Sequence, residues 1–334
     1  MADPIPVVQV GLGALGRLLT GYLIARPYLH IVGAVDTDPG LVGRDLGEVA
    51  GIGKKLGVQV CDDLPAGLAN GSAAVAVQTT VSDLSAAKPQ IEALVSRGAN
   101  VVSSCEELSY PWQTAPAASA DLDRRARAAG VSVLGTGVNP GFLMDLLPIV
   151  LTAICSEVRT VTVLRYQDAR SRRLPFQKKI GAGLTLEEFA AKKARGTLRH
   201  VGLTESMHMI ASRLGWPLDR TEDIIEPVVA QRSIASDHLT VEAGHASGVY
   251  QRGLGYVGEE ERIRLEFRAS LGEEDVQDTV IVDGVPPLTF TNRAGVNGDV
   301  ATCSLLVNAV PAILSAPPGL RTMADIPPVS WLSG

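Results

Sequence analysis

The stretch Val7-Val-Gln-Val-Gly-Leu-Gly-Ala-Leu-Gly16 decides the fold of this chain. It consists of an apolar strand, Val7–Val10, followed at once by a G-x-G-x-x-G turn that opens a helix. In such a turn Gly11 permits the tight bend, Gly13 lets the backbone approach a pyrophosphate, and Gly16 allows close packing of helix on sheet. The helix N-terminus offers unpaired N–H groups to the anion. This context predicts a dinucleotide site; a glycine turn without a ligand is the alternative.

A carboxylate follows the motif at the distance expected for ribose recognition. Asp36 ends the next predicted strand, twenty residues after Gly16, where it can accept hydrogen bonds from ribose hydroxyls. Its negative charge disfavours the 2′-phosphate of NADP, so the sequence favours NAD. Arg17 leaves the choice open, because it is either a solvated helix residue or a partner of a 2′-phosphate.

The first 140 residues alternate short β-branched runs with helix-like segments. The predicted strands are Val7–Val10, Ile31–Asp36, Val58–Cys61, Ala73–Gln78, Val101–Ser104 and Val131–Leu134. Because these runs are almost continuously apolar, they suit a parallel sheet with helices on both faces. The predicted fold class is therefore α/β, with a doubly wound parallel sheet of the Rossmann type.

Two threonines follow the fourth predicted strand. Thr79 and Thr80 lie where dinucleotides cross an open parallel sheet. Capping of the helix that begins near Ser82 or Asp83 is an equally open role for them. That helix is expected to reach Arg97.

After Gly141 the short apolar runs give way to an apolar helix and longer strand-like runs. A second α+β domain built on an open sheet is expected there. The predicted elements are a helix at Phe142–Ala153, strands at Val158–Tyr166, Ile224–Ile234, Ile263–Ser270 and Val276–Val282, and helices at Leu184–Arg195 and Thr204–Leu214. A last apolar helix, about Val300–Leu314, is expected to pack back on the first domain. The predicted domains are a dinucleotide-binding domain, residues 1–140 joined by 297–334, and a substrate and dimerisation domain, residues 141–296.

Composition and charge exclude several classes of protein. Hydrophobic residues make up 46% of the chain and charged residues 20%, which is typical of a packed soluble protein and not of a disordered one. The formal charge of −6 has the wrong sign for a nucleic-acid partner. No signal peptide or membrane span is recognisable, so a cytoplasmic protein without a membrane partner is expected. The four cysteines and five histidines show no ligand spacing, so no metal site is expected.

Two adjacent carboxylates follow the fifth predicted strand. Glu106 and Glu107 stand at the carboxyl end of a central strand, where this fold places its chemistry. If the segment is extended, only one of the two side chains can face the cleft. One of them is then a candidate acid or base. A helix N-terminus, where glutamates interact favourably with the helix dipole, is the alternative reading.

Several segments together resemble a known family. They are Gly11–Gly16, Cys105-Glu-Glu-Leu-Ser-Tyr-Pro111, Gly135-Thr-Gly-Val-Asn-Pro-Gly-Phe142, Lys179-Ile-Gly-Ala-Gly183, His200-Val-Gly-Leu203 and Asn308-Ala-Val-Pro311. In this order, over nearly the whole chain, they are similar to the 2,4-diaminopentanoate dehydrogenases and the related native amine dehydrogenases, which share a dihydrodipicolinate-reductase-like N-terminal domain. The glycine turn is common to many dehydrogenases, whereas the Cys-Glu-Glu-Leu and Val-Asn-Pro-Gly-Phe segments are more specific.

The resemblance implies an NAD(P)-dependent amine dehydrogenase, usually a homodimer, that interconverts an amine with a small ketone or aldehyde plus ammonia. The catalytic carboxylate implied is Glu106, with Glu107 as its supporting partner. The residues implied near the substrate are Glu106, Leu143, Tyr166, His200 and Thr302. The cofactor residues expected from motif and resemblance together are Gly11, Leu12, Gly13, Ala14, Leu15, Gly16, Arg17, Asp36, Thr79, Thr80, Asn139 and Pro140.

Substrate identity stays open at this stage. A true diaminopentanoate enzyme must recognise an amino-acid head group, for which Arg165, Arg170, Arg172 and Arg173 are the candidates. The alternatives to an amine dehydrogenase are a reductase of cyclic imines, like dihydrodipicolinate reductase, and a non-catalytic NAD(P) sensor. A homoserine-type dehydrogenase is disfavoured, because Glu106 stands where that family has a lysine.

Overall fold

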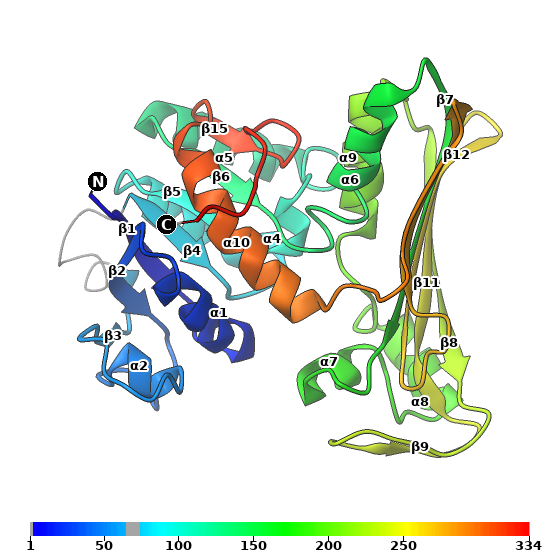
Figure 1. Cartoon of the computed structure of the whole chain (residues 1–334), viewed down its shortest axis with the longest axis horizontal. Coiled ribbons are helices and arrows are strands. Elements are labelled where there is room, and N and C mark those ends of the chain that lie inside the picture. The colour runs from blue at the N-terminus through cyan, green and yellow to red at the C-terminus, as the bar shows by residue number, and fades with distance from the viewer. Residues whose placement is uncertain (1–2, 65–73, 334) are drawn as a thin grey trace. The chain divides into compact units, whose positions relative to one another are not determined.

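The structure, a computed structural model, describes residues 3–64 and 74–333. It divides into two compact units. The first unit is Met1–Phe142 with Asn297–Gly334, and the second unit is Leu143–Val296. Figure 1 gives the elements of each unit and their labels.

The first unit is built on a seven-stranded, wholly parallel sheet. Its strands are β1 (Ile5–Val10), β2 (Leu29–Val35), β3 (Val60–Cys61), β4 (Val75–Gln78), β5 (Asn100–Ser103), β6 (Ser132–Gly135) and β15 (Gly319–Arg321). Their order is β15-β6-β5-β4-β1-β2-β3, and each pair is parallel. The order reverses between β1 and β4, which is the switch point where ligands bind in open sheets of this class. The predicted fold class is confirmed.

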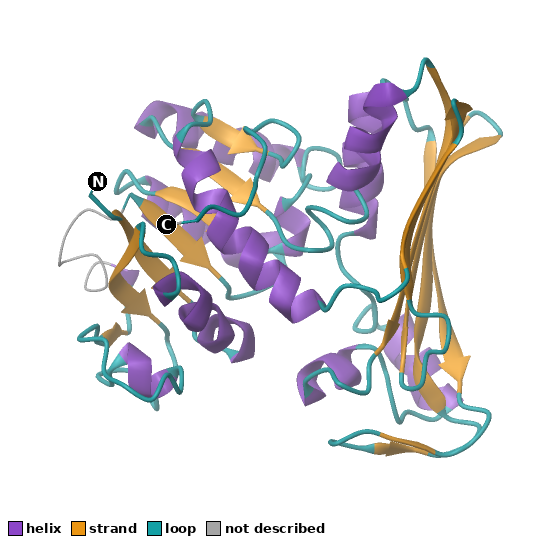
Figure 2. Cartoon of the chain, viewed as in Figure 1, coloured by secondary structure: helices purple, strands orange, loops and turns teal. Residues whose placement is uncertain are grey.

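Helices cover this sheet on both faces (Figure 2). They are α1 (Ala14–Ile24), α2 (Leu46–Val49), α4 (Leu84–Val95), the short 3-10 turn η1 (Glu106–Leu108), α5 (Pro116–Ala129) and α10 (Gly298–Leu314). Helix α10 packs against α1, β4, β5 and β6. Strand residues such as Val8, Val101 and Val133 are fully buried, as the continuous apolar runs predict. The start of the predicted strand Ala73–Gln78 lies outside the described residues.

The second unit is built on a six-stranded mixed sheet. Its strands are β7 (Glu157–Asp168), β8 (Arg220–Val229), β11 (Ala246–Val257), β12 (Glu260–Ser270), β13 (Gln277–Val285) and β14 (Leu288–Asn292), in the order β14-β13-β7-β12-β11-β8. Only β7 and β12 are parallel to each other. A separate pair, β9 (Ile234–Ala235) and β10 (Thr240–Val241), completes the strands of this unit.

Helices of the second unit lie on one face of its six-stranded sheet (Figure 2). They are α6 (Leu146–Leu151) with the 3-10 turn η2 (Thr152–Ile154), α7 (Leu174–Lys179), α8 (Leu186–Ala194) and α9 (Leu203–Leu214). Helix α9 packs against β8, β11 and β12. From Val161 onward, buried and half-buried residues alternate along β7, because successive side chains point to opposite faces of the sheet.

Two predicted elements of this unit have different bounds. The helix expected at Phe142–Ala153 begins only at Leu146, because Asp145 caps it: its side chain accepts a hydrogen bond from the Leu146 N–H at 2.6 Å. The strand expected at Ile224–Ile234 is β8, which ends at Val229. Within residues 3–64 and 74–333, no helix is long and apolar enough to cross a membrane.

Candidate active site

The glycine turn between β1 and α1 packs tightly at two of its three glycines. Gly11 has a φ of +91°, and a Cβ there would lie 2.6 Å from the carbonyl oxygen of Thr79. A Cβ on Gly16 would lie 2.0 Å from the carbonyl oxygen of Gly11. A Cβ on Gly13 would meet no atom within 4 Å. Folding therefore requires glycine at 11 and 16, whereas glycine at 13 keeps the surface of the turn open to a ligand.

Two buried polar side chains, Gln9 and Thr20, stabilise the glycine turn through hydrogen bonds. Gln9, fully buried on β1, donates from Nε2 to the carbonyl oxygen of Gly16 at 2.6 Å and accepts a hydrogen bond from the Thr20 hydroxyl at 3.0 Å. Neither residue was predicted from the sequence to have a role at the site. Gln9 could have been noticed in the sequence, because it is a polar residue in an otherwise apolar strand. A buried amide needs a hydrogen-bonding partner.

Asp36 lies against the glycine turn. Its Oδ2 accepts a hydrogen bond from the Leu12 N–H at 2.5 Å, and its Oδ1 accepts one from the Asp38 N–H at 2.8 Å. Arg17 is exposed, and its Nε donates to the carbonyl oxygen of Leu12 at 3.0 Å. The turn thus holds a carboxylate and an exposed guanidinium side by side. Ala14 and Leu15 form the first turn of α1.

Thr79 and Thr80 have separate roles at the end of β4. The Thr79 hydroxyl donates to the carbonyl oxygen of Gly11 at 3.0 Å, so it fastens the glycine turn to the neighbouring strand. The Thr80 hydroxyl donates to Oε1 of Gln90 at 3.0 Å. Neither caps α4, because the cap of that helix is Asp83, which accepts a hydrogen bond from the Ala86 N–H. The capping alternative for the two threonines is therefore wrong.

The two glutamates after β5 lie in a 3-10 turn and not in an extended segment. Successive side chains of such a turn point about 120° apart, so the two carboxylates diverge. Leu84 is the first residue of α4. Its N–H donates a hydrogen bond to Oε2 of Glu107 at 2.9 Å. Glu107 therefore satisfies an N–H at the start of α4, a different helix from the one in which it lies. Glu106 is half-buried on the same turn.

A chain of hydrogen bonds fixes the backbone from which Glu106 projects. The Ser103 hydroxyl donates to Oε1 of Gln78 at 2.9 Å and accepts from the Cys105 N–H at 3.1 Å. The Gln78 amide continues the chain to Gln90 at 2.7 Å. Burial raises the pKa of the Cys105 thiol to about 12, so it stays protonated and unreactive beside the glutamates.

The loop after β6 carries Asn139 and Pro140, both predicted near the cofactor. Gly141 has a φ of +124°, and a Cβ there would lie 2.5 Å from the Gly137 nitrogen, so the loop closes tightly on itself. The hydroxyl of Thr302, on α10, accepts a hydrogen bond from the Val138 N–H at 3.2 Å. Thr302, predicted to line the substrate pocket, thus supports the loop of Asn139.

In the second unit, the structure separates two residues that were predicted to share the substrate pocket. His200 stacks on the ring of Phe267, with centroids 4.2 Å apart. Tyr166 pairs in register with Arg268, the residue after Phe267 on β12, so it points to the opposite face of the sheet. Because successive side chains of a strand alternate, Tyr166 and His200 lie on opposite faces of this sheet.

Tyr166 instead belongs to a polar cluster on that opposite face. Its hydroxyl donates to Oε2 of Glu266 at 2.5 Å, and Tyr250 donates to the same oxygen at 2.6 Å. Burial and the hydrogen bond to Glu266 raise the pKa of Tyr166. Burial alone would raise the pKa of Glu266, but the hydrogen bonds from Tyr166 and Tyr250, together with the charge and hydrogen bond of Arg264, lower that pKa. Leu143, which was also predicted to line the pocket, is the first residue of this unit and is buried.

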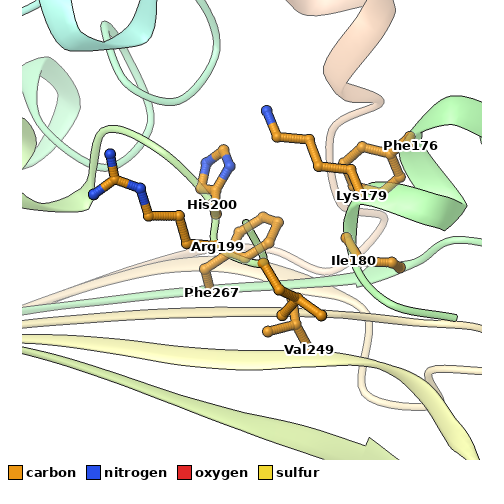
Figure 3. A pocket seen from close by; sticks show the side chains of 8 residues that line it. Phe176, Lys179, Ile180, Arg199, His200, Val249 and Phe267 are labelled. Atoms are coloured by element: carbon orange, nitrogen blue, oxygen red, sulfur yellow. The ribbon is translucent and has the colours of Figure 1, made fainter. Parts of the chain in front are cut away.

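A pocket opens on the face that carries His200 (Figure 3). Its apolar lining includes Phe176, Ile180, Val249 and Phe267, and its basic lining is Lys179, Arg199 and His200. Gln251, which is fully buried, holds the backbone of His200 by accepting from its N–H at 2.6 Å and donating to its carbonyl at 3.1 Å. The pocket is thus an apolar floor with a basic rim.

The arginines proposed for a substrate carboxylate have other partners. Arg165 is 1% exposed, and its Nη1 lies 2.6 Å from Oδ1 of Asp278. Burial lowers the pKa of Arg165 to about 10, so it stays charged at neutral pH. Arg170 forms an ion pair with Asp168 at 2.6 Å. The remaining two are Arg172, which donates to Gln167 and lies over the Phe176 ring, and Arg173, the N-cap of α7.

The described residues were also compared with the ligand sets of metal sites. Among the residues that the structure describes, no three His, Cys, Asp or Glu side chains are grouped so that they could hold a metal ion.

Comparison with known proteins decides the family. Residues 142–334 match the model of the 2,4-diaminopentanoate dehydrogenase C-terminal domain. The chain is 34% identical to the 2,4-diaminopentanoate dehydrogenase of Acetoanaerobium sticklandii over 346 residues, which cover 97% of this chain and 94% of that protein. The chain belongs to the 2,4-diaminopentanoate dehydrogenase family.

Amine dehydrogenases are also similar to this member of the family. The amine dehydrogenase of Streptomyces virginiae is 26% identical over 97% of this chain and 96% of its own length. The structure of the amine dehydrogenase of Mycobacterium smegmatis superposes with a TM-score of 0.87 at 25% identity, over 98% of this chain and 97% of that one. The predicted resemblance and the predicted enzyme class, an NAD(P)-dependent oxidoreductase that acts on amines, are confirmed.

Proposed function

We propose that this chain catalyses the reversible reductive amination of a small ketone or aldehyde with ammonia, with Glu106 as its acid and base. The division of work between the two adjacent glutamates carries this proposal. Glu107 holds the first N–H of α4 at 2.9 Å, whereas Glu106 projects from the same turn at a different angle. The turn is fixed by Ser103 and lies at the carboxyl end of a central strand, the edge where this fold places its chemistry.

The residues of the glycine turn fit a dinucleotide. Gly13 leaves the turn open, and the start of α1 offers N–H groups to a pyrophosphate. We assign the cofactor contacts to Gly11–Arg17, Asp36, Thr79, Thr80, Asn139 and Pro140. When bound, the reduced nicotinamide supplies a hydride. The carboxylate of Asp36 favours NAD over NADP, because it would repel a 2′-phosphate.

Glu106 suits the proton transfers that amination requires. An ammonium ion must lose a proton before its nitrogen can attack the carbonyl carbon, and the Glu106 carboxylate takes that proton. The carboxylic acid then returns the proton to the hydroxyl of the carbinolamine, which leaves as water. Glu106 is negative again when the carbon–nitrogen double bond is cationic, so it stabilises the species that accepts the hydride. The amine formed takes one proton from solvent.

A pair of variants tests this assignment. In Glu106→Gln, which is nearly isosteric, kcat should fall by about 10²- to 10⁴-fold, the typical contribution of general acid–base catalysis, while cofactor affinity is kept. Glu107→Gln should retain most of the turnover and lower the melting temperature instead, because it weakens the hydrogen bond to the Leu84 N–H at the start of α4. Steady-state rates with ammonium and fluorescence titration of NADH measure both. A Glu106→Gln enzyme with full activity would refute the mechanism, and the reverse ranking would exchange the two glutamates.

The resemblance also implies a homodimer, and we propose that state for this chain. Light scattering coupled to size-exclusion chromatography tests it directly: a mass of twice the 35.1 kDa chain is expected, and a single-chain mass would refute it.

A further inference from the structure

Two glutamines are fully buried near the carboxyl ends of neighbouring strands in the first unit. Gln9 lies on β1 and Gln78 is the last residue of β4, and each is 0% exposed. The two strands pair in parallel, with Val10 opposite Gln78. Burial of an amide costs free energy unless its donor and acceptor find partners. The partners of each glutamine therefore indicate what it does.

The two amides hold different parts of the candidate site. Gln9 hydrogen-bonds to the glycine turn and to the helix that follows it. Oε1 of Gln78 instead accepts a hydrogen bond from the Ser103 hydroxyl at 2.9 Å, and its Nε2 donates to Oε1 of Gln90 at 2.7 Å. These partners of Gln78 lie on β5 and α4. The side chain of Gln78 thus faces the strand that leads to Glu106.

The hydrogen bonds around Gln78 have a fixed direction. The Ser103 hydroxyl has one proton, which it donates to Gln78, while its oxygen accepts from the Cys105 N–H at 3.1 Å. Oε1 of Gln90 accepts from Gln78 and also from the Thr80 hydroxyl at 3.0 Å. A flipped Gln78 amide would place its oxygen against Oε1 of Gln90 and its NH₂ group against the Ser103 proton. The amide therefore has one favourable orientation.

The main chain on both sides of Glu106 is also held. The carbonyl oxygen of Gln78 accepts a hydrogen bond from the Ser104 N–H at 2.9 Å, and two residues later the chain enters η1, whose first residue is Glu106. On the far side, Ser109 donates to the Glu106 carbonyl oxygen from its N–H at 3.2 Å and from its hydroxyl at 2.8 Å. The place from which the Glu106 side chain starts is thus set by its neighbours.

We propose that Gln78 is a positioning residue for Glu106, acting through the Ser103 side chain and the Ser104 main chain. This inference rests on the proposed function, in which Glu106 moves the protons. Proton transfer requires hydrogen-bond reach, and a misplacement of about 1 Å can lower a rate about 100-fold. An uncharged amide fixes the turn without adding a charge beside the carboxylate. The same amide also ties this turn, through Gln90, to Thr80 on the cofactor side of the strand end.

The test applies one substitution to both buried glutamines. Gln78→Met and Gln9→Met each replace a buried amide by an apolar side chain of similar length, and each removes the oxygen that accepts from a hydroxyl. Their melting temperatures should therefore fall by similar amounts. Ser103→Ala breaks the same link as Gln78→Met with a smaller change. Its matched control is Ser119→Ala, which removes another buried serine hydroxyl, on α5, whose partner is the Ala115 carbonyl oxygen.

Gln78→Met and Ser103→Ala should each lower the kcat of ammonium-dependent NADH oxidation by about 10- to 100-fold. Both should change the Kd of NADH by less than about threefold, and Ser119→Ala should change neither quantity. Gln9→Met should instead weaken NADH binding by about tenfold, because the glycine turn loses its support. The solvent isotope effect on kcat should rise only in Gln78→Met and Ser103→Ala, because proton transfer then limits the rate.

Two results would overturn the positioning role. One is a loss of kcat in Gln78→Met and Ser103→Ala no larger than in Ser119→Ala. The other is the same weakening of NADH binding in Gln78→Met as in Gln9→Met, which would place the amide of Gln78 in support of the cofactor turn.

Combination with Glu106→Gln separates this inference from the proposed function. If Gln78 acts through Glu106, adding Gln78→Met to Glu106→Gln should lower kcat by less than about threefold, since residues that act as a unit are not additive. A further loss as large as in wild type would overturn the inference. A fully active Glu106→Gln enzyme would contradict the proposed role of Glu106 itself. An inactive Glu106→Gln enzyme beside a fully active Gln78→Met enzyme would contradict only the role of Gln78.

Discussion

The carboxyl edge of the seven-stranded sheet and the helix-covered face of the six-stranded sheet use polar side chains in different ways. At the first, Asp36, Thr79 and Glu107 each hydrogen-bond to a main-chain group of a neighbouring element. At the second, the basic side chains of Lys179 and Arg199 reach the rim of a pocket. Hydrogen bonds to the main chain therefore fix the polar side chains of the first region, whereas the second region presents basic side chains at a pocket.

This contrast predicts that changes in the first unit act on every carbonyl alike, whereas changes in the pocket of the second unit alter the choice of carbonyl. The buried ion pair of Arg165 with Asp278 provides the largest expected effect on stability, because loss of one partner leaves the other charge buried and uncompensated.

Arg165→Met should destabilise the protein by about 3–5 kcal/mol, because it leaves Asp278 buried without its cation. Arg159→Met is the matched control: it removes a pair between the same two strands, Arg159 with Asp283, that is half-exposed. The control should hardly move the urea unfolding midpoint. An unfolding midpoint for Arg165→Met as high as that of Arg159→Met would contradict this expectation.

The glycine turn gives the next largest effect. Gly16→Ala should lower stability by about 1–3 kcal/mol, since its Cβ would lie 2.0 Å from the Gly11 carbonyl oxygen and the helix must shift. Gly13→Ala should leave the melting temperature unchanged, because its Cβ meets no atom, yet weaken NADH binding by about tenfold. Thermal melts and fluorescence titrations measure the two effects. Tight NADH binding by Gly13→Ala would contradict the cofactor site.

Asp36→Ala should give the smallest effect, a shift in cofactor preference. Loss of the carboxylate should weaken the binding of NADH by about tenfold and that of NADPH by less. The Asp36 carboxylate is expected to bind the ribose 2′-hydroxyl, which is free in NADH and phosphorylated in NADPH. The dissociation constants of NADH and NADPH, measured for wild type and variant, test this shift. The variant also loses the hydrogen bond between the Leu12 N–H and Asp36, but this loss affects both cofactors equally. An equal weakening would remove the ribose assignment.

The first unit could be read from the sequence in considerable detail. Six of its strands are short apolar runs that the sequence predicts, whereas the edge strand β15 was not predicted, because three residues give no strand pattern. The division between Glu106 and Glu107 could not be read in the same way. It depends on a 3-10 turn and on the N–H of Leu84, which is 23 residues away in the sequence.

The second unit was harder to predict, and β11 shows why. Strand Ala246–Val257 was not predicted, because Gly248, Gly253 and Gly255 weaken its strand pattern. A Cβ at Gly248 would lie 1.9 Å from the Ala269 carbonyl oxygen, so glycine is needed there for close pairing with β12. The face on which Tyr166 lies depends on the register of β7 with β12, and register between distant strands leaves no local signal.

The measurement that tests the account most directly is oxidation of NADH and NADPH by small ketones, aldehydes and 2-amino-4-oxopentanoate, each with and without ammonium, at a pH of about 8–9 so that more of the ammonium is deprotonated. Oxidation of the reduced cofactor that requires ammonium is the expected result. Oxidation that proceeds equally well without ammonium, or tight binding of both cofactors with no oxidation of either, would contradict it.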